Sequence, residues 1–238
     1  IGKTLLMISG GIDSVVAGYL AIKRGMSIDA IHFAAPPYTS PLAVQKVIDL
    51  LETIVPYTEY QDINLYVVPF TEIQKAIYEF TKEDYCITIM RRMMYRISEK
   101  LARKIGALAI VNGENIGQVA SQTLESMDTI ESVVKIPIIR PLAVFDKQDI
   151  IHIATQIKTY DISILPYEDC CTVFVPRHPQ IKPNLNCAIT EENKINFEDM
   201  INKALDNTKR IVLRINRHYD YLEIKPNEDK KIEIDELF

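Results

Sequence analysis

The chain has 238 residues, of which 47% are hydrophobic, and a net charge of −5, so it is long and apolar enough to bury a core. The negative charge excludes a generally basic coat for nucleic acid, and any RNA contact would have to be a local patch. The sequence has no apolar run of about 18 residues and no signal-peptide pattern, which predicts a protein without a membrane segment.

The four cysteines are too few for a disulfide framework in a chain of this length. We therefore expect a reducing, cytoplasmic compartment. The first residue is Ile1 and not Met, which we interpret as a fragment of a longer protein or a missing start.

The first predicted element is an apolar strand at residues 4–8, followed by the turn SGGIDS at residues 9–14 and a helix that runs to residue 24. Adjacent glycines let the backbone approach a ligand closely, and the two serines add hydroxyl donors. The free N–H groups at the start of the helix favour a phosphate. The turn matches neither the GxxxxGK[ST] nor the GxGxxG pattern. The alternative is an ordinary turn with a Ser/Asp cap.

Strands and helices then alternate along the chain. Further strands are predicted at residues 28–33, 65–68 and 107–111, and further helices from residue 41 and over residues 84–105 and 146–158. This alternation predicts an α/β fold, a doubly wound parallel sheet with helices on both faces. Ligands bind such sheets at the carboxyl ends of the strands. We therefore expect the site near residues 9–14, 32–33 and 112–118.

The C-terminal part of the chain has a different composition. A proline-rich connector at residues 166–183 precedes a predicted helix at 191–207, a strand at 209–215 and an acidic, mobile tail from residue 225. We predict a nucleotide-binding domain over residues 1–185 and a helix/strand extension with the acidic tail over residues 186–238.

Nine short motifs point to one protein family. They are SGGIDS (9–14), HF (32–33), PPYTS (36–40), VPFTE (68–72), IMRRMM (89–94), GE (113–114), GQVASQTLES (117–126), RPL (140–142) and LPYEDC (165–170). Together they resemble the ThiI family of tRNA 4-thiouridine synthases, which are PP-loop ATP pyrophosphatases. The resemblance runs from about residue 3 to about residue 182. It implies an adenine nucleotide alpha-hydrolase-like fold, ATP with Mg²⁺, and tRNA as substrate.

The resemblance also implies which residues contact ATP. Carried over motif by motif, they are Met7, Ile8, Ser9, Gly10, Gly11, Ser14, His32, Phe33, Arg91, Gly113 and Gln122. For His32, which lies on an apolar strand, the alternative is a core histidine with a satisfied hydrogen bond.

Asp13 is the carboxylate of the glycine turn. It is the candidate Mg²⁺ ligand and a candidate catalytic residue, because Mg²⁺ prefers oxygen ligands shared with phosphates. The equally weighted alternative is that it accepts backbone N–H bonds and ties the loop together.

Cys170 is the second candidate catalytic residue, because the resemblance implies that the cysteine of LPYEDC handles sulfur. Reaction needs exposure of the thiol, which we expect in this proline-bounded loop. Two adjacent acids would raise the pKa of the thiol unless Arg177, His178 or a substrate compensates. The role of Cys171 stays open. We interpret Cys86 as a structural cysteine and Cys187 as an inactive one. The alternative for Cys187 is a disulfide with Cys170.

The predicted helix over residues 84–105 carries a basic stripe, Arg92, Arg96, Lys100 and Arg103. A solvated helix face is the more common explanation of such a stripe. A surface that follows the phosphates of tRNA is the alternative.

The function implied is adenylation of uracil O4, followed by sulfur transfer from a persulfide on Cys170. The expected partners are tRNA and a cysteine desulfurase, with no membrane, while a homodimer and a role in thiamine biosynthesis stay open. The ferredoxin-like and THUMP modules that precede this domain in the family, and a rhodanese domain, are not in the sequence. The alternatives are an amide-forming ligase of the NAD or GMP synthetase kind, a non-catalytic ATP-binding module, and an iron–sulfur variant for which no CxxC spacing exists.

Overall fold

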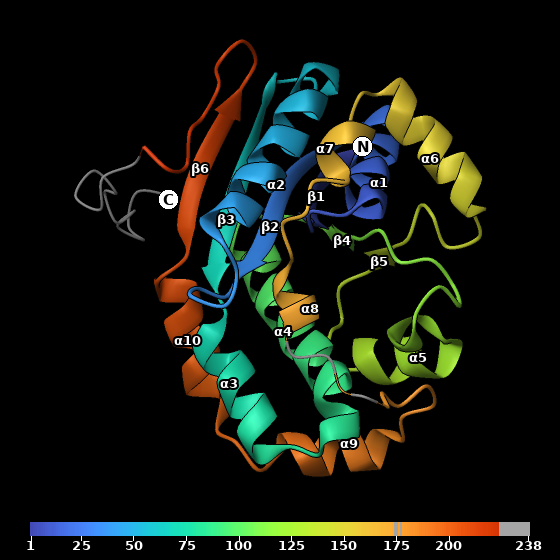
Figure 1. Ribbon diagram of the computed structural model, residues 1–238, viewed down its shortest axis with the longest axis vertical. Coiled ribbons are helices and arrows are strands. Elements are labelled where there is room, and N and C mark those ends of the chain that lie inside the picture. Colours follow the sequence, from blue (N-terminus) through green and yellow to red (C-terminus); the bar gives the residue numbers. More distant parts are fainter. Residues whose placement is uncertain (174–175, 177, 224–238) are drawn as a thin grey trace.

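The computed structural model describes residues 1–173, 176 and 178–223, with the backbone alone for residues 171 and 172. It contains one six-stranded sheet with the strand order β5-β4-β1-β2-β3-β6 (Figure 1). The strands are β1 Gly2–Met7, β2 Met26–Ala34, β3 Asp62–Pro69, β4 Ala109–Val111, β5 Ile138–Ile139 and β6 Lys209–Arg214. All pairs are parallel except β3 with β6, at one edge of the sheet. The predicted α/β class and doubly wound parallel sheet are confirmed.

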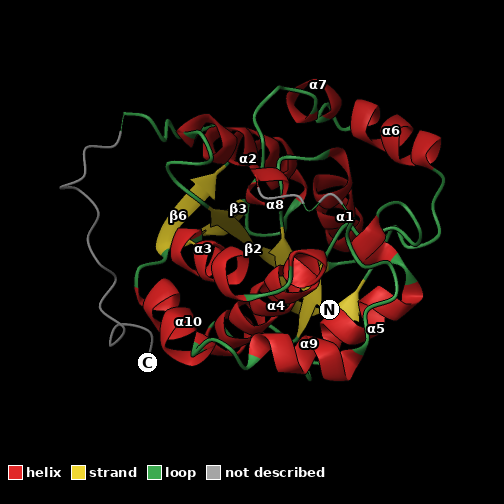
Figure 2. Cartoon of the chain, turned by 60° about the horizontal axis from the view of Figure 1, so that its bottom comes forward, coloured by secondary structure: helices red, strands yellow, loops and turns green. Residues whose placement is uncertain are grey.

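Helices cover both faces of the sheet, as Figure 2 shows. They are α1 Ile12–Lys23, α2 Pro41–Ile54, α3 Thr71–Phe80, α4 Cys86–Lys104, α5 Leu124–Glu131, α6 Lys147–Gln156, α7 Tyr160–Ser163, α8 Cys170–Val173, α9 Leu185–Glu192 and α10 Phe197–Asp206. Buried side chains of α1, α2 and α6 form a core on one face of the sheet, and those of α3, α4, α9 and α10 form a core on the other face. No described helix has the length and apolar character that a bilayer requires.

The chain changes direction across the sheet after β3. From β1 it passes through α1, β2 and α2 to β3, always toward the same edge. It then crosses through α3 and α4 to β4, which lies on the other side of β1. The carboxyl ends of β1 and β4 therefore form the topological switch point, where ligands bind in sheets of this kind.

The helix α2 shows how the local sequence sets an element. Ser40 is its N-cap and accepts a hydrogen bond from the backbone N–H of Leu42 at 3.2 Å, and Pro41 occupies the first turn. The predicted apolar positions of this helix, Val44, Val47, Ile48 and Leu51, are buried.

The basic stripe of α4 is only partly a solvated face. Arg92 is 2% exposed, and its guanidinium lies 2.7 Å from the carboxylate of Glu192 on α9, which Arg96 also contacts at 2.9 Å. Lys100 pairs with Glu198 on α10. The prediction of a solvated stripe is therefore wrong for Arg92, because acids from the C-terminal helices cover that side of α4. The same pairs leave less charge for tRNA phosphates than the sequence indicates.

The C-terminal residues complete the same sheet and core. β6 pairs with β3 over residues 209–214, and α10 buries Phe197, Ile201 and Ala204 against the core that α4 lines. The predicted helix at 191–207 is two helices, α9 and α10, and the predicted strand at 209–215 is β6. The boundary at residue 185 stays a prediction, and the tail from residue 225 lies outside the described residues.

We expect the substitution Arg92→Met to lower the free energy of unfolding by about 3 kcal/mol, because it leaves Glu192 with one fewer counter-charge in a buried position. Arg103→Met on the same helix is the matched control. Its guanidinium is 60% exposed and pairs with Glu99 one turn away, so the loss should stay below about 1 kcal/mol. The chain has no tryptophan, so urea unfolding would be followed by far-UV circular dichroism. Equal losses in the two variants would contradict the buried-pair interpretation.

Candidate nucleotide site

The turn between β1 and α1 is folded by its own two serines. The Ser14 hydroxyl donates to the carbonyl of Ser9 at 2.9 Å and accepts from the N–H of Ser9 at 3.1 Å. The hydroxyl of Ser9 accepts a longer bond from the N–H of Gly11 at 3.3 Å. Gly11 is the N-cap of α1 and has no side chain that could cap the helix. The ordinary turn with a Ser/Asp cap, which was the alternative, is therefore not what the structure shows. No side chain caps the start of α1, as an anion site requires.

Gly113, just after β4, touches the first turn of α1. A Cβ atom at this position would lie 2.6 Å from the backbone carbonyl carbon of Asp13 and 2.6 Å from the backbone nitrogen of Ser14. Only glycine fits without moving one of the two backbones. This contact holds the ends of β1 and β4 together at the switch point.

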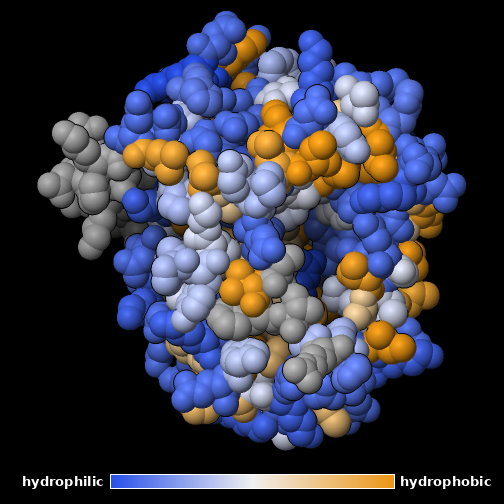
Figure 3. Space-filling view, viewed as in Figure 1, coloured by the Kyte–Doolittle hydropathy of each residue, from blue (hydrophilic) through white to orange (hydrophobic). Residues whose placement is uncertain are grey.

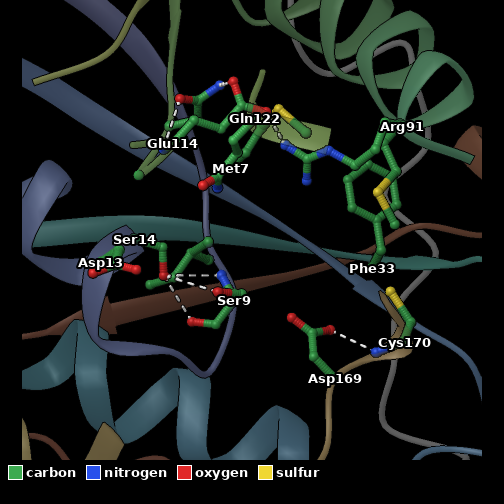
Figure 4. A pocket seen from close by; sticks show the side chains of 14 residues that line it. Met7, Ser9, Asp13, Ser14, Phe33, Arg91, Glu114, Gln122, Asp169 and Cys170 are labelled. Carbon is green, nitrogen blue, oxygen red and sulfur yellow. Dashed lines mark hydrogen bonds and ion pairs between the residues drawn. The ribbon is translucent and has the colours of Figure 1, made fainter. Parts of the chain in front are cut away.

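A cavity of about 160 Å³ opens at this point, and Figure 3 shows a hollow with a hydrophilic floor near the middle of this face. The predicted site residues that line the cavity are Met7, Ile8, Ser9, Asp13, Ser14, Phe33, Arg91, Gly113, Gln122 and Cys170. The other lining residues are Met94, Asn112, Glu114 and Asp169. Figure 4 shows Ser9 and Ser14 on one side of the cavity and Cys170 on the other.

Three predicted residues are not among those that line the cavity. Gly10 and Gly11 lie in the turn beside it, and His32 lies within the sheet. His32 is 2% exposed, and its Nδ1 atom lies 3.1 Å from the carbonyl oxygen of Ile8. This arrangement matches the core-histidine alternative, and contact between His32 and a nucleotide stays a prediction.

Glu114 is the centre of a buried charge cluster at the wall of the cavity. It is 3% exposed and pairs with Arg91, with Arg140 at 2.9 Å and with the hydroxyl of Tyr95 at 3.0 Å. Burial alone would raise the pKa of Glu114, but Arg91 and Arg140 outweigh it and hold this pKa below its usual value. Burial and the Glu114 charge raise the pKa of Tyr95. The cluster therefore holds Arg91 oriented at the cavity.

The carboxylate of Asp13 does not tie the loop together through backbone N–H groups. It pairs with Lys147 at 2.6 Å and accepts from the side-chain amide of Gln118 at 3.2 Å. The acids that line the cavity are Asp13, Asp169 and Glu114, and the arginines already occupy Glu114. Mg²⁺ commonly binds through one or two carboxylates plus phosphate oxygens. Asp13 offers a carboxylate of this kind at the cavity, and its role as a Mg²⁺ ligand stays a prediction.

Cys170 is the first residue of the short helix α8, and it is 1% exposed. The expectation that this loop exposes the thiol is wrong. Cys170 lies in the wall of the cavity, where packed protein atoms cover it. Its N–H donates to its neighbour Asp169 at 2.7 Å, and its carbonyl accepts a bond from Gln74 at 2.6 Å. The backbone of Cys170 is therefore held by hydrogen bonds at both its N–H and its carbonyl.

The other cysteines differ in burial. Cys86 is buried at the start of α4, and burial raises the pKa of its thiol, as suits a structural residue. Cys187 is exposed on α9. The side chain of Cys171 and the whole of Arg177, which we considered as a compensating charge, lie outside the described residues.

Comparisons with known proteins agree with this geometry. The family model described as thiamine biosynthesis protein (ThiI) matches residues 1–197. The chain belongs to the ThiI family. The resemblance predicted from the motifs is thereby confirmed.

Relatives of the ThiI family cover most of this chain. A probable tRNA sulfurtransferase of Geobacillus thermodenitrificans (strain NG80-2) is 51% identical over 212 residues, which are 89% of this chain and 52% of the relative. A probable tRNA sulfurtransferase of Geobacillus kaustophilus (strain HTA426) is 52% identical with the same coverage. The chain spans about half the length of the curated relatives it matches.

Two solved structures show the same fold. A 4-thiouridine synthetase in complex with RNA and bound ATP has a TM-score of 0.85 and 41% identity, over 90% of this chain and 55% of that chain. An NMN synthetase from Francisella tularensis has a TM-score of 0.53 and 16% identity, over 86% of this chain and 83% of that chain. The second likeness concerns the fold alone.

We expect Glu114→Gln to lower the free energy of unfolding by about 3 kcal/mol near neutral pH, because Arg91 and Arg140 lose a buried counter-charge. The folded-state pKa of Glu114 lies below its ordinary value of 4.5, so its contribution is complete above that value and is lost as the pH falls through the folded pKa. The difference between the two proteins should therefore shrink below about pH 4.

Urea unfolding at several pH values, followed by circular dichroism, measures this difference. Glu131→Gln is the control, because Glu131 pairs with Arg140 from a side chain that is 39% exposed, and it should show little loss. A difference that stays constant into strong acid would show that the Glu114 charge is not what stabilises the cluster.

Proposed function

We propose that this chain carries out ATP-dependent 4-thiolation of uridine in tRNA, as a tRNA sulfurtransferase of the ThiI family. The observation that carries the proposal is that one cavity contains both an anion-binding turn and a cysteine (Figure 4). The turn suits the phosphates of ATP, and the cysteine suits sulfur transfer. The relative with 41% identity, a 4-thiouridine synthetase, was solved with ATP and RNA, which supports the same ligands for this chain.

In the first step the phosphates of ATP lie over the turn of Ser9 and Ser14 and the N-terminus of α1. The O4 atom of uridine attacks the α-phosphorus, pyrophosphate leaves, and the uracil becomes adenylated. Arg91, which Glu114 orients, faces the same cavity and can stabilise the negative charge that develops on the phosphate. Met7 and Ile8 at the end of β1 and Phe33 on β2 also line this cavity.

Asp13 is the residue that would hold Mg²⁺, with Asp169 as a second acid. The ion supplies neutralisation of the phosphate charge when it is bound. Asp13 also pairs with Lys147 at 2.6 Å.

In the second step sulfur replaces the adenylate. The terminal sulfur of a persulfide on Cys170 attacks C4 of the uracil, and AMP leaves with the former O4 atom. A second thiol, as the reductant, then attacks the Cys170 sulfur and forms a disulfide with it. The bond between the Cys170 sulfur and the new sulfur breaks, and 4-thiouridine is released.

The partners follow from this chemistry. The persulfide sulfur would come from a cysteine desulfurase, and tRNA is the substrate, in the cytoplasm. We also propose that the chain serves thiamine biosynthesis, for which the family is named, and that it forms a homodimer. An amide-forming ligase on the same fold would not need a thiol in the nucleotide cavity, so the position of Cys170 favours thiolation.

We expect Cys170→Ser to leave tRNA-dependent release of pyrophosphate within about twofold of the unchanged protein and to abolish formation of 4-thiouridine, because the thiol takes part only after adenylation. Both products are measured with ATP, Mg²⁺, unmodified tRNA and a persulfide donor. Cys187→Ser, at an exposed cysteine on α9, is the matched control and should retain both activities. Loss of pyrophosphate release in Cys170→Ser would refute this division of labour.

A further inference from the structure

Lys46 is a buried lysine in the middle of α2, with 5% of its surface exposed. Its ammonium donates a hydrogen bond to the carbonyl of Leu165 at 2.7 Å. Its side chain also runs along the turn of the nucleotide site, since its Cδ, Cε and Nζ atoms lie 3.2, 3.4 and 3.6 Å from where a Cβ of Gly10 would be. Lysine is rarely buried without a specific partner. This side chain therefore joins the start of the segment 165–170 to the glycine turn.

Gln74 holds the other end of that segment. It lies on α3 and is 3% exposed, and its side-chain amide donates to the carbonyl of Cys170 at 2.6 Å. Its own carbonyl oxygen is buried and has no hydrogen-bond partner within the described part of the chain. A buried polar atom without a partner lowers the free energy of unfolding, so a contribution to general stability does not explain why this residue is a glutamine. The hydrogen bond to the carbonyl of Cys170 explains it.

The two anchors come from opposite faces of the sheet. α2 contributes to one core and α3 to the other, so the segment 165–170 crosses the carboxyl edge of the sheet between them. Between the anchors, Asp169 accepts the N–H of Cys170 at 2.7 Å and also attracts the ammonium of Lys46. Burial lowers the pKa of Lys46, and the Asp169 carboxylate partly offsets this. Cys170 thus faces the cavity from a segment fixed at both ends (Figure 4).

We propose that Lys46 and Gln74 are positioning residues for the sulfur of Cys170, which hold it in the wall of the nucleotide cavity at a fixed place relative to the glycine turn. The proposal rests on the proposed function, in which that sulfur meets the adenylated uracil. Neither side chain lines the cavity itself. Their effect is therefore on the place of the thiol, and because Lys46 also contacts the glycine turn, Gln74 is the residue that separates this effect from ATP binding.

The test is the rate at which iodoacetamide alkylates Cys170, read by peptide mass spectrometry with fragmentation to separate it from Cys171. We compare the unchanged chain with Gln74→Met and Lys46→Met, because methionine has a similar length and suits an apolar surrounding. Gln156→Met and Lys23→Met, at exposed positions on α6 and α1, are the matched controls. Each protein is measured with and without ATP and Mg²⁺, and its ATP affinity and melting temperature are recorded.

In both anchor variants we expect Cys170 to be alkylated about tenfold faster, because the segment opens more often once a buried hydrogen bond is lost. ATP should slow alkylation in the unchanged chain and less so in the variants. In Gln74→Met the ATP affinity should stay within about twofold, and the melting temperature should change little, since the orphaned oxygen is removed. A merely structural role would instead lower the melting temperature and leave ATP protection intact.

Unchanged alkylation rates in both variants would overturn the proposal. If one variant is unfolded by circular dichroism, the other decides alone, because each anchor is predicted to act on the same thiol. If the unchanged chain does not bind ATP, the proposed function fails, whereas the alkylation rates without ATP still decide whether the two side chains hold Cys170.

Discussion

The site depends on the close approach of two backbones at Gly113. Because this residue has no side chain, the end of β4 touches the first turn of α1, and the two strands that flank the switch point present their ends to one cavity. The turn of Ser9 and Ser14 supplies the anion-binding side, and the residues after β4 supply the charged side. A larger residue would force these two sides apart.

Glu114 is the counter-charge of the arginines at the cavity. Arg91 lines the cavity, and an arginine held in packed protein needs a counter-charge. Glu114 supplies it from a buried position and links Arg91 on α4 with Arg140 after β5. The same principle operates on the far side of α4, where Glu192 on α9 neutralises Arg92. The C-terminal helices thus stabilise the helix that presents Arg91.

The cavity joins segments that are far apart in the sequence. β1, α4, the end of β4 and the segment before α8 each contribute one part of it. In the proposed function the turn binds phosphate, and sulfur transfer uses a thiol held at a constant distance from the reacting carbon. The segment 165–170 places Cys170 at the sheet edge, between helices of opposite faces.

The sequence by itself determined the α/β class, the glycine turn, the main strands and the family, because these depend on local periodicity and on contiguous motifs. It did not predict α3, α5 or the two-residue strand β5, whose local signals are short. Only the tertiary structure decided that Arg92 is buried, that Glu114 is the hub of the site, that His32 bonds to Ile8, and that Cys170 is shielded. The physical reason is that these features depend on partners 19 to 100 residues away in the chain, and burial and charge compensation are set by such partners and not by the neighbours in sequence.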